Sequence, residues 1–173
     1  MASNPLSNGR SKGRSCRTLD LRDPLMSAKQ PKREPRIGVD EYGRTPLHYA
    51  AADSQPAEVV RLLALGANAN LQDDDGWSAL HFAAQAASAE CAATLLEAKA
   101  NVSLQDSFGN TALFRAVFAS NGNGSLIGLL RAAGADPLAK NKHGVSPVAL
   151  ARTIANYDVA QFFTDVEGPN RET

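Results

Sequence analysis

The chain has 173 residues, of which 43% are hydrophobic and 21% charged, and equal numbers of basic and acidic side chains give a formal net charge of zero. Its two cysteines, Cys16 and Cys91, are too few and too distant for a disulfide framework or a metal-ligand motif. No apolar run approaches the length of a membrane span, and the N-terminus lacks the apolar core of a secretory signal. These totals favour one domain in a reducing compartment, and we expect a cytoplasmic protein.

The first segment, residues 1–36, differs in charge from the rest of the chain. It carries nine Lys and Arg against three Asp and Glu, whereas residues 37–173 carry nine against fifteen. Its many Ser, Asn and Pro residues and its lack of a hydrophobic period predict a flexible tail. Two interpretations stay open, a solvated extension and a basic arm for nucleic acid or an acidic protein. Met26 is an alternative start for the same domain, which leaves open whether residues 1–25 belong to the working protein.

Beyond this segment, regularly spaced glycines mark an internal repeat. Gly43, Gly76 and Gly109 stand 33 residues apart, and Gly144 follows after 35. A hydroxyl residue two positions after each glycine keeps the same spacing: Thr45, Ser78, Thr111 and Ser146. A second marker, "ALGANAN", "EAKANVS" and "AAGADPL", keeps the same step, and both markers place the two extra residues near "SNGNGS". Two markers that agree in this way indicate a repeat architecture.

Each unit begins with a sequence that favours a helix start. In "TPLHYAA", Thr45 suits the N-cap, because its hydroxyl can accept a hydrogen bond from the first turn, and Pro46 suits the next position. A second apolar segment follows each time: "PAEVVRLLAL", "SAECAATLLEA", "SLIGLLRAA" and "YDVAQFF". Gly66 and Gly134 stand where a helix end commonly needs a left-handed residue, and Lys99 replaces that glycine in the second unit, either at some strain cost or with a different cap. Each unit is therefore predicted to hold two helices, and Ser120–Ser125 to lengthen the turn between those of the third.

The period, the Thr-Pro-Leu-His block and the Gly-Ala-Asn or Gly-Ala-Asp exit resemble ankyrin repeats over about residues 38–166. The resemblance implies an all-α repeat fold, an ankyrin solenoid of about four helix–turn–helix units with hairpin-like loops. About three or more units are needed, because one unit cannot bury its apolar face alone. The predicted limits are a basic polar N-terminal tail at 1–36, a repeat domain at 37–166 with units at about 40–72, 73–105, 106–140 and 141–166, and a C-terminal tail at 167–173.

The polar motifs of the chain do not combine into a catalytic or metal site. His48 and His81 recur at one repeat position, and the resemblance implies that this histidine braces adjacent units through hydrogen bonds. Asp73, Asp74 and Asp75 do not follow the alternating ligand pattern of a calcium loop. "SNGNGSLIG" lacks the preceding strand and the Gly-Lys-Ser/Thr of a phosphate-binding loop. We therefore predict no catalytic residue, no metal, no cofactor and no small-molecule substrate.

The resemblance implies a protein-binding surface instead, since in ankyrin arrays the loop tips and the exposed side of each first helix line a concave face. Tyr42, Trp77 and Phe108 are expected to form an aromatic line at one register of successive tips, and Tyr and Trp commonly anchor interfaces. The candidate partner-binding residues, carried over position by position, are Glu41, Tyr42, Arg44, Asp53, Asp74, Asp75, Trp77, Gln85, Phe108, Asn110, Phe118, Lys142 and His143.

The leading hypothesis is a non-enzymatic protein, monomeric when free, that binds another protein. The half from "NTALFRAVF" to "NYDVAQFF" is similar to small stand-alone bacterial ankyrin proteins, some of which are immunity proteins that neutralise a toxin. The acidic body suits a basic toxin or effector domain by charge complementarity, and it makes nucleic acid a poor partner outside residues 1–36. The alternative is a regulatory or scaffolding ankyrin adaptor that binds host proteins.

Overall fold

The computed structural model describes residues 38–166, and the predicted tails at 1–36 and 167–173 lie outside these residues. The described chain forms seven α-helices and one 3₁₀-helix: α1 (Pro46–Ala52), α2 (Pro56–Ala64), α3 (Ala79–Gln85), α4 (Ala89–Glu97), α5 (Ala112–Ala119), α6 (Ser125–Ala132), α7 (Pro147–Thr153) and η2 (Val159–Phe163). Its β-structure is limited to two isolated antiparallel bridges, Gln72 with Ser78 and Gln105 with Thr111. The prediction of an all-α repeat fold is therefore confirmed.

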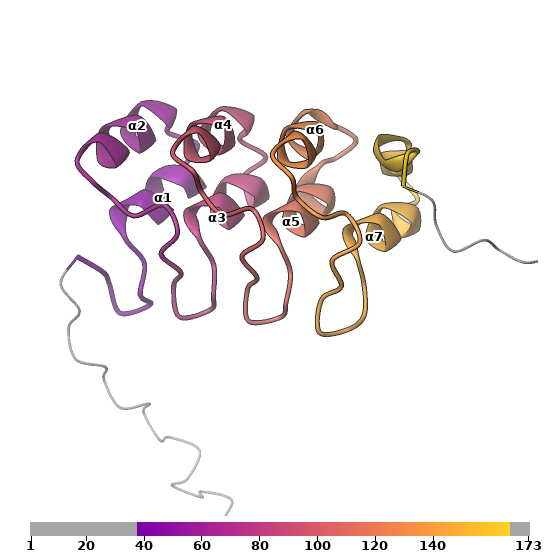
Figure 1. The fold of residues 1–173 in the computed structure, drawn as a ribbon, viewed down its shortest axis with the longest axis horizontal. Coiled ribbons are helices and arrows are strands. Elements are labelled where there is room, and N and C mark those ends of the chain that lie inside the picture. Colours follow the sequence, from indigo (N-terminus) through magenta and orange to yellow (C-terminus); the bar gives the residue numbers. More distant parts are fainter. Residues whose placement is uncertain (1–37, 167–173) are drawn as a thin grey trace, which may run out of the picture. The chain divides into compact units, whose positions relative to one another are not determined.

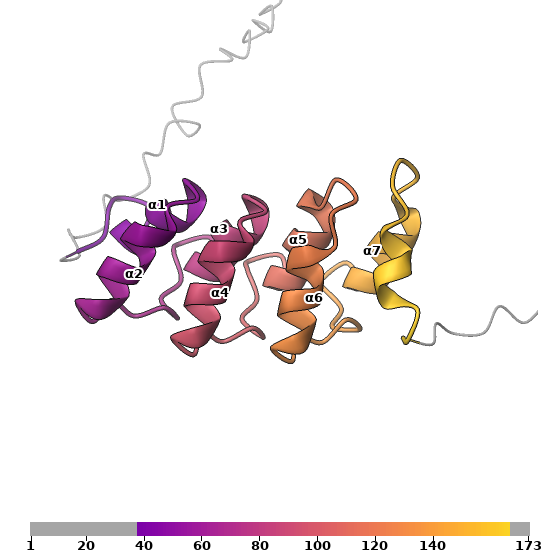
Figure 2. The same cartoon turned by 90° about the horizontal axis from the view of Figure 1, so that it is seen from above.

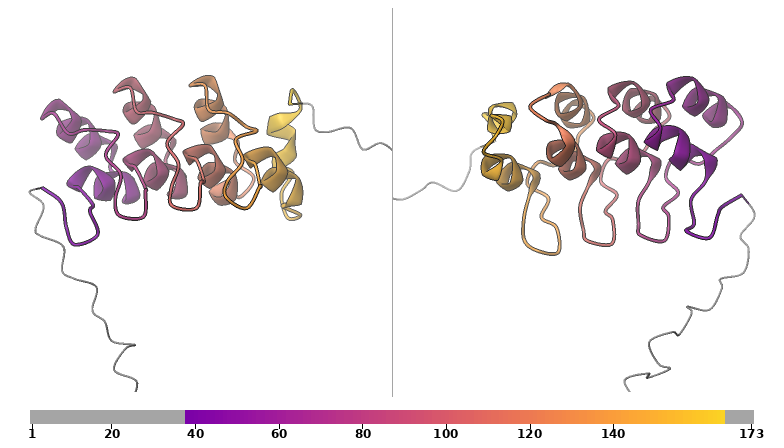
Figure 3. Two further views of the ribbon diagram at one scale, coloured as in Figure 1. Left: turned by 60° about the horizontal axis from the view of Figure 1, so that its bottom comes forward. Right: turned by 180° about the vertical axis from the view of Figure 1, so that it is seen from behind.

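The helices form pairs, and the pairs lie side by side. Figure 1 shows α1, α3, α5 and α7 in one row and α2, α4 and α6 in a second row, and Figure 2 shows the same pairs from above. The loops extend from the first row on the side away from the second row, as both views of Figure 3 show. This arrangement brings the tip of each loop next to the tip of the following one.

The first helix of every unit starts at its predicted N-cap residue: Thr45, Ser78, Thr111 and Ser146. All four have an extended backbone, as an N-cap requires. Thr111 Oγ1 accepts a hydrogen bond from the Phe114 N–H, and Ser146 Oγ accepts one from the Ala149 N–H. In the two units that have a histidine, the ring takes part in the cap instead, as described below.

Small side chains allow the first helices of neighbouring units to approach closely. Ala50, Ala83 and Ala116 occupy the same position in α1, α3 and α5, and each is buried. Leu95 of α4 and Leu130 of α6 are fully buried as well. The alanines therefore set the distance between units, and the leucines of the second helices fill the core with well-packed apolar volume.

Left-handed residues end the second helices at the predicted positions. Gly66 and Gly134 have φ of 88° and 90°, and Lys99 adopts φ of 65° at the same place. A side chain in this region costs about 1 kcal/mol relative to glycine, because the β-carbon crowds the backbone. Of the two alternatives for Lys99, the structure shows the strained left-handed backbone.

The fourth unit differs from the others in its second helix. The segment predicted as that helix, "YDVAQFF", instead forms the five-residue 3₁₀-helix η2, with Val159 and Phe163 buried. Arg131 of α6 holds this segment, since its guanidinium donates to the Phe162 carbonyl oxygen at 2.6 Å and pairs with Asp165. The short helix thereby covers the last α-helical pair.

The predicted insertion, Ser120–Ser125, lengthens the turn between α5 and α6 as expected. Two of its glycines face aromatic rings of the C-terminal segment. A β-carbon on Gly122 would lie 3.0 Å from the Tyr157 ring, and one on Gly124 would overlap the Phe162 ring. The insertion therefore packs closely against the C-terminal segment, and glycine at these two positions makes the packing possible.

Candidate protein-binding surface

One side chain closes the tip of each loop. Oδ1 of Asp106 accepts hydrogen bonds from the backbone N–H groups of Phe108 and Asn110, at 2.9 and 2.8 Å. Asp40, Asp73 and Asn141 close their own tips with the same pair of bonds. This use explains why the position recurs as Asp, and it places Asp73 in the framework of the loop rather than in a calcium site.

Backbone hydrogen bonds join each tip to the next. The Asp74 N–H donates to the Tyr42 carbonyl oxygen at 2.9 Å. In the same way, the Ser107 N–H donates to the Asp75 carbonyl oxygen at 2.8 Å, and the Lys142 N–H to that of Phe108 at 2.9 Å. The tips are therefore fixed relative to one another. Side chains that they present form a preorganised surface, which lowers the entropic cost of binding a partner.

His48 and His81 hold α1 and α3 to the neighbouring loops. Nδ1 of each ring accepts the N–H of its own N-cap residue, at 2.9 and 3.2 Å. Nε2 of His48 lies 3.0 Å from the Leu71 carbonyl oxygen, and Nε2 of His81 lies 3.1 Å from that of Asn110. Because Nδ1 accepts a proton-bearing N–H, Nε2 must carry the ring proton and donate, so both rings are neutral. Burial lowers the pKa of both histidines accordingly.

Two arginines and three aromatic rings form a cation–aromatic ladder across the first three units: Tyr42, Arg44, Phe82, Trp77 and Arg115. The Arg44 guanidinium lies 5.4 Å from the centre of the Tyr42 ring and 5.2 Å from that of Phe82. The Phe82 and Trp77 rings are 5.0 Å apart, and the Arg115 guanidinium lies 4.2 Å from the Trp77 ring. Contacts of this kind contribute about 0.5–1 kcal/mol each at partly exposed sites.

Each arginine of the ladder also pairs with a tip aspartate. Arg44 Nε donates to Asp73 Oδ2 at 3.2 Å, and Arg115 pairs with Asp106. Burial by itself would raise the pKa of Asp106, but hydrogen bonds from Arg115 and Asn110 outweigh it and hold the pKa below its usual value. The Asp73 and Asp106 carboxylates are therefore buried and paired with arginines inside the fold, so they are not available to a partner.

Most of the predicted partner-binding residues are exposed: Glu41, Tyr42, Asp53, Asp74, Asp75, Gln85, Phe108, Phe118, Lys142 and His143. Three are not. Arg44 and Trp77 are half-buried members of the ladder. Asn110 is only 7% exposed, since its amide donates to Asp106 and its oxygen accepts from Asn141. The Asn110 side chain therefore serves the fold, contrary to its expected availability to a partner.

The expected aromatic line is interrupted in the second unit. Tyr42 and Phe108 stand three residues before the N-cap of a first helix, and each is 55% exposed. Asp75 holds that position in the second unit, whereas Trp77 stands two residues later and packs into the ladder. Placing Trp77 at the same register as Tyr42 and Phe108 is therefore wrong.

Sequence reasoning missed Tyr49, an exposed aromatic residue of α1. Its ring is 45% exposed, and its hydroxyl donates to Asp40 at 2.5 Å. That hydrogen bond lowers the pKa of Asp40. The signal was present in the repeat alignment, because Phe82 and Arg115 occupy the same position in the next two units. Three large side chains at one register of the first helices mark a surface rather than the alanine-rich core.

Charge is divided unevenly along the described chain. Residues 38–105, which contain the first two units, hold nine Asp and Glu against three Lys and Arg, a net charge of −6, whereas residues 106–166 hold four Asp and Glu against five Lys and Arg, a net charge of +1. In the first range, the carboxylates of Asp73 and Glu58 pair with arginines. The excess of acidic side chains therefore belongs to the first two units, where it gives the surface a negative potential.

Within residues 38–166, no group of three or more His, Cys, Asp and Glu side chains is placed to hold a metal ion. Cys91 of α4 is a buried free thiol. None of the helices in this range is long and apolar enough to cross a membrane.

Stacked helix pairs joined by tip loops define a helical repeat protein, a class that binds partners along an extended surface. A family model for ankyrin repeats in three copies matches residues 50–141, more than half of the chain. The chain therefore belongs to the ankyrin-repeat family. No curated protein gives a match to it. Ankyrin repeats are generally non-enzymatic binding modules, so membership indicates a protein–protein interaction module.

Proposed function

We propose that this chain is a non-enzymatic protein that binds one protein partner through its tip face, the surface formed by the loop tips and the exposed sides of the first helices. The position of the exposed aromatic side chains carries this proposal. Of five large aromatic residues that are exposed within residues 38–166, four lie on tips or first helices: Tyr42, Tyr49, Phe108 and Phe118. Aromatic residues are enriched at protein interfaces and supply much of their binding energy.

The second-helix side of the described chain is of a different kind. Two large apolar residues of a second helix are exposed, Val60 in α2 and Leu65 at its C-cap, and both are aliphatic. Scattered aliphatic side chains are ordinary on the surface of monomeric proteins. The contrast between the two sides favours the tip face.

Phe108 illustrates how the fold prepares this face. Its N–H donates to Asp106, its carbonyl oxygen accepts from the Lys142 N–H, and its ring is 55% exposed. A backbone held on both sides leaves little freedom to lose on binding. Phe118, on α5, is 63% exposed and belongs to the same unit. The third unit therefore supplies two anchors.

In its more specific form, the proposal is an immunity or antitoxin-like protein that neutralises a basic toxin or effector domain. The net charge of −6 over residues 38–105 supports it, because such a field steers a basic partner and favours its complex. A cytoplasmic location and a monomeric free state belong to the same proposal, and nucleic acid would bind only through residues 1–36. A scaffolding adaptor for host proteins is the alternative.

The experiment is a capture from native lysate with a C-terminally tagged chain, identification by mass spectrometry, and co-expression of each captured protein in growing cells. The immunity form expects one small basic protein at one-to-one stoichiometry, whose expression stops growth unless the chain is present. Several unrelated proteins without toxicity or rescue would overturn that form in favour of an adaptor. Undiminished capture by a Phe108→Ala, Phe118→Ala double variant would overturn the tip face.

A further inference from the structure

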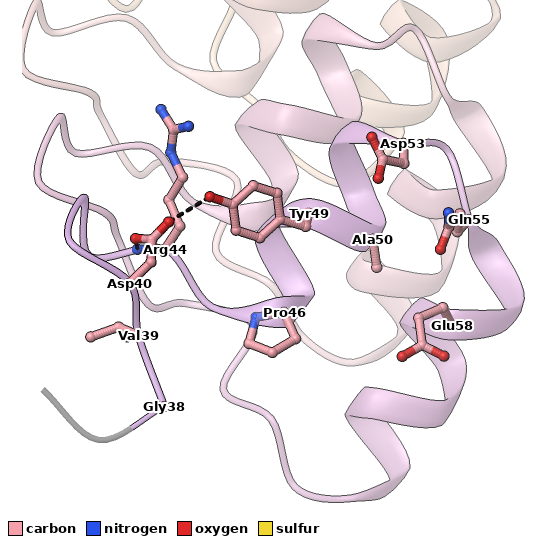
Figure 4. A pocket seen from close by; sticks show the side chains of 10 residues that line it. All are labelled: Gly38, Val39, Asp40, Arg44, Pro46, Tyr49, Ala50, Asp53, Gln55 and Glu58. Atoms are coloured by element: carbon pink, nitrogen blue, oxygen red, sulfur yellow. Dashed lines mark hydrogen bonds between the residues drawn. The ribbon is translucent and has the colours of Figure 1, made fainter.

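The outer side of the first unit carries a hollow of about 630 Å³, which Figure 4 shows from close by. In the following units the corresponding surface is covered by the preceding helix pair. Pro46 of α1 is exposed, whereas Ala79 and Ala112, at its position in α3 and α5, are each 1% exposed. The volume lies within the range of pockets that hold drug-sized ligands. The first unit thus presents a surface of docking size that the described chain leaves open.

A carboxylate stands on this surface where the next unit has an apolar side chain. Glu58 is the third residue of α2, and Cys91, at the same position in α4, is 0% exposed. Covering Glu58 with a further apolar unit would bury its charge at considerable cost. Its ion pair with Arg61, at 2.6 Å, joins two exposed or partly exposed side chains and can be exchanged for another cation. The residue type therefore favours a cationic occupant.

Asp53 adds a second carboxylate without a structural reason. It is the C-cap of α1, it is exposed, and its side chain makes no hydrogen bond or ion pair within residues 38–166. A negative charge at the C-terminal end of a helix meets the negative end of the helix dipole, which is unfavourable for the helix. The same position is favourable for a bound cation, which meets both the carboxylate and the dipole.

The hollow combines this charge with an apolar floor. Figure 4 shows Pro46 and Ala50 between Asp40 at one end and Asp53 and Glu58 at the other. Arg44 also lines the hollow, but its guanidinium is already taken up by Asp73. An apolar floor with carboxylates at both ends matches lysine and arginine, whose aliphatic stems cover apolar surface while their charged ends reach polar groups.

We propose that this hollow binds a basic peptide segment of the partner protein, with aliphatic stems over Pro46 and Ala50 and charged ends at Asp40 and between Asp53 and Glu58. The site is separate from the aromatic anchors of the third unit. It rests on the proposed function only in that both assign the chain a basic protein partner. A peptide assay tests it without that partner, so that failure of one does not imply failure of the other.

The experiment measures binding of a fluorescein-labelled hexapeptide of alternating lysine and leucine to the full chain, by fluorescence anisotropy at low salt. Removing the rim charges with Asp53→Asn and Glu58→Gln should weaken binding about fivefold or more, since two exposed ion pairs are lost. The matched control, Glu90→Gln with Glu97→Gln, removes two exposed charges of α4 that lie away from the hollow. It should change the affinity for the peptide less than twofold. Amide shifts in the nuclear magnetic resonance spectrum should centre on Tyr49, Asp53 and Gln55.

Three results would overturn the proposal. If the rim and control variants weaken peptide binding equally, the loss follows from net charge and not from a site at the hollow. Absence of binding, or shifts centred on the loop tips, would remove the site. Binding seen only after Lys29, Lys32, Arg33 and Arg36 are changed to Gln would mean that the basic segment of this chain competes for the hollow, in place of a partner. Circular dichroism melting of each variant verifies that the fold is retained.

Discussion

Replacing Gly76 by alanine should be much more damaging than the same change at Gly144, although both glycines stand at the same position of the repeat. Their φ angles are 78° and 77°, so both variants meet the same conformational cost of about 1 kcal/mol. A β-carbon on Gly144 meets nothing within 4 Å. A β-carbon on Gly76 would lie 2.9 Å from the Ser107 nitrogen and 3.1 Å from the Asp106 backbone.

The neighbours of Gly76 are backbone atoms that cannot rotate away. Moving them would stretch the hydrogen bond from the Ser107 N–H to the Asp75 carbonyl oxygen, now 2.8 Å. Overpacking of this kind costs about 1–3 kcal/mol, which puts Gly76→Ala near 3 kcal/mol and Gly144→Ala near 1 kcal/mol. Urea unfolding followed by circular dichroism measures both, with equal slopes as the condition for comparing midpoints. Equal losses in the two variants would refute the reasoning that close backbone approach between tips holds the units together.

Three further predictions concern stability. Trp77→Ala should lower the free energy of unfolding by about 2 kcal/mol or more, because the ring lies within the ladder, and an unchanged melting temperature would contradict this. Gly124→Ala should lower the free energy of unfolding by about 1–2 kcal/mol, because the new β-carbon displaces the Phe162 ring, whereas the φ of −87° at Gly124 is ordinary for any residue. In a double-mutant cycle, Gly124→Ala should be nearly neutral when Phe162 has been changed to Ala. Burial lowers the pKa of His48 and His81 below the usual 6.5, so the unfolded chain takes up more protons than the folded chain as the pH falls through that value. The free energy of unfolding should therefore be highest above about pH 7 and should decline toward pH 5. Urea unfolding of His81→Gln over this pH range should show a smaller decline.

Local features of the fold could be predicted from the sequence because each depends on a few neighbouring residues. Thr111 and Ser146 cap helices because a hydroxyl followed by an apolar helical stripe favours a helix start. The helix end at Lys99 could be recognised because the glycines of other units mark that position, and a left-handed backbone was one of two alternatives there. A repeat strengthens such predictions, because the same structural position can be compared in every unit.

The exposure of the candidate residues could be predicted less well, because exposure depends on contacts between units. Trp77 has the composition of an interface anchor, but it packs on Phe82 and under Arg115, which lie on α3 and α5. Asn110 lies at a tip, yet Asp106 and Asn141 take up its amide from two different units. Such pairings follow from the distance between neighbouring units, which no single repeat encodes.

The end of the array was predicted only in part, for a related reason. The apolar residues of "YDVAQFF" suggested a second α-helix, and Phe163 is indeed buried. The segment forms a 3₁₀-helix whose position depends on Arg131 and on the glycines of the insertion. Long-range contacts override local helix preference in such a short segment.

The most direct measurement of partner binding is isothermal titration calorimetry of the captured partner with two matched double variants. Phe108→Ala with Phe118→Ala removes two exposed aromatic rings from the tip face, and Val60→Ala with Leu65→Ala removes two exposed aliphatic side chains from the second-helix side. We expect the first pair to weaken the affinity by about 30-fold or more, which corresponds to about 2 kcal/mol, and the second to change it less than twofold. The opposite pattern would contradict binding through the tip face and would place the partner on the second helices.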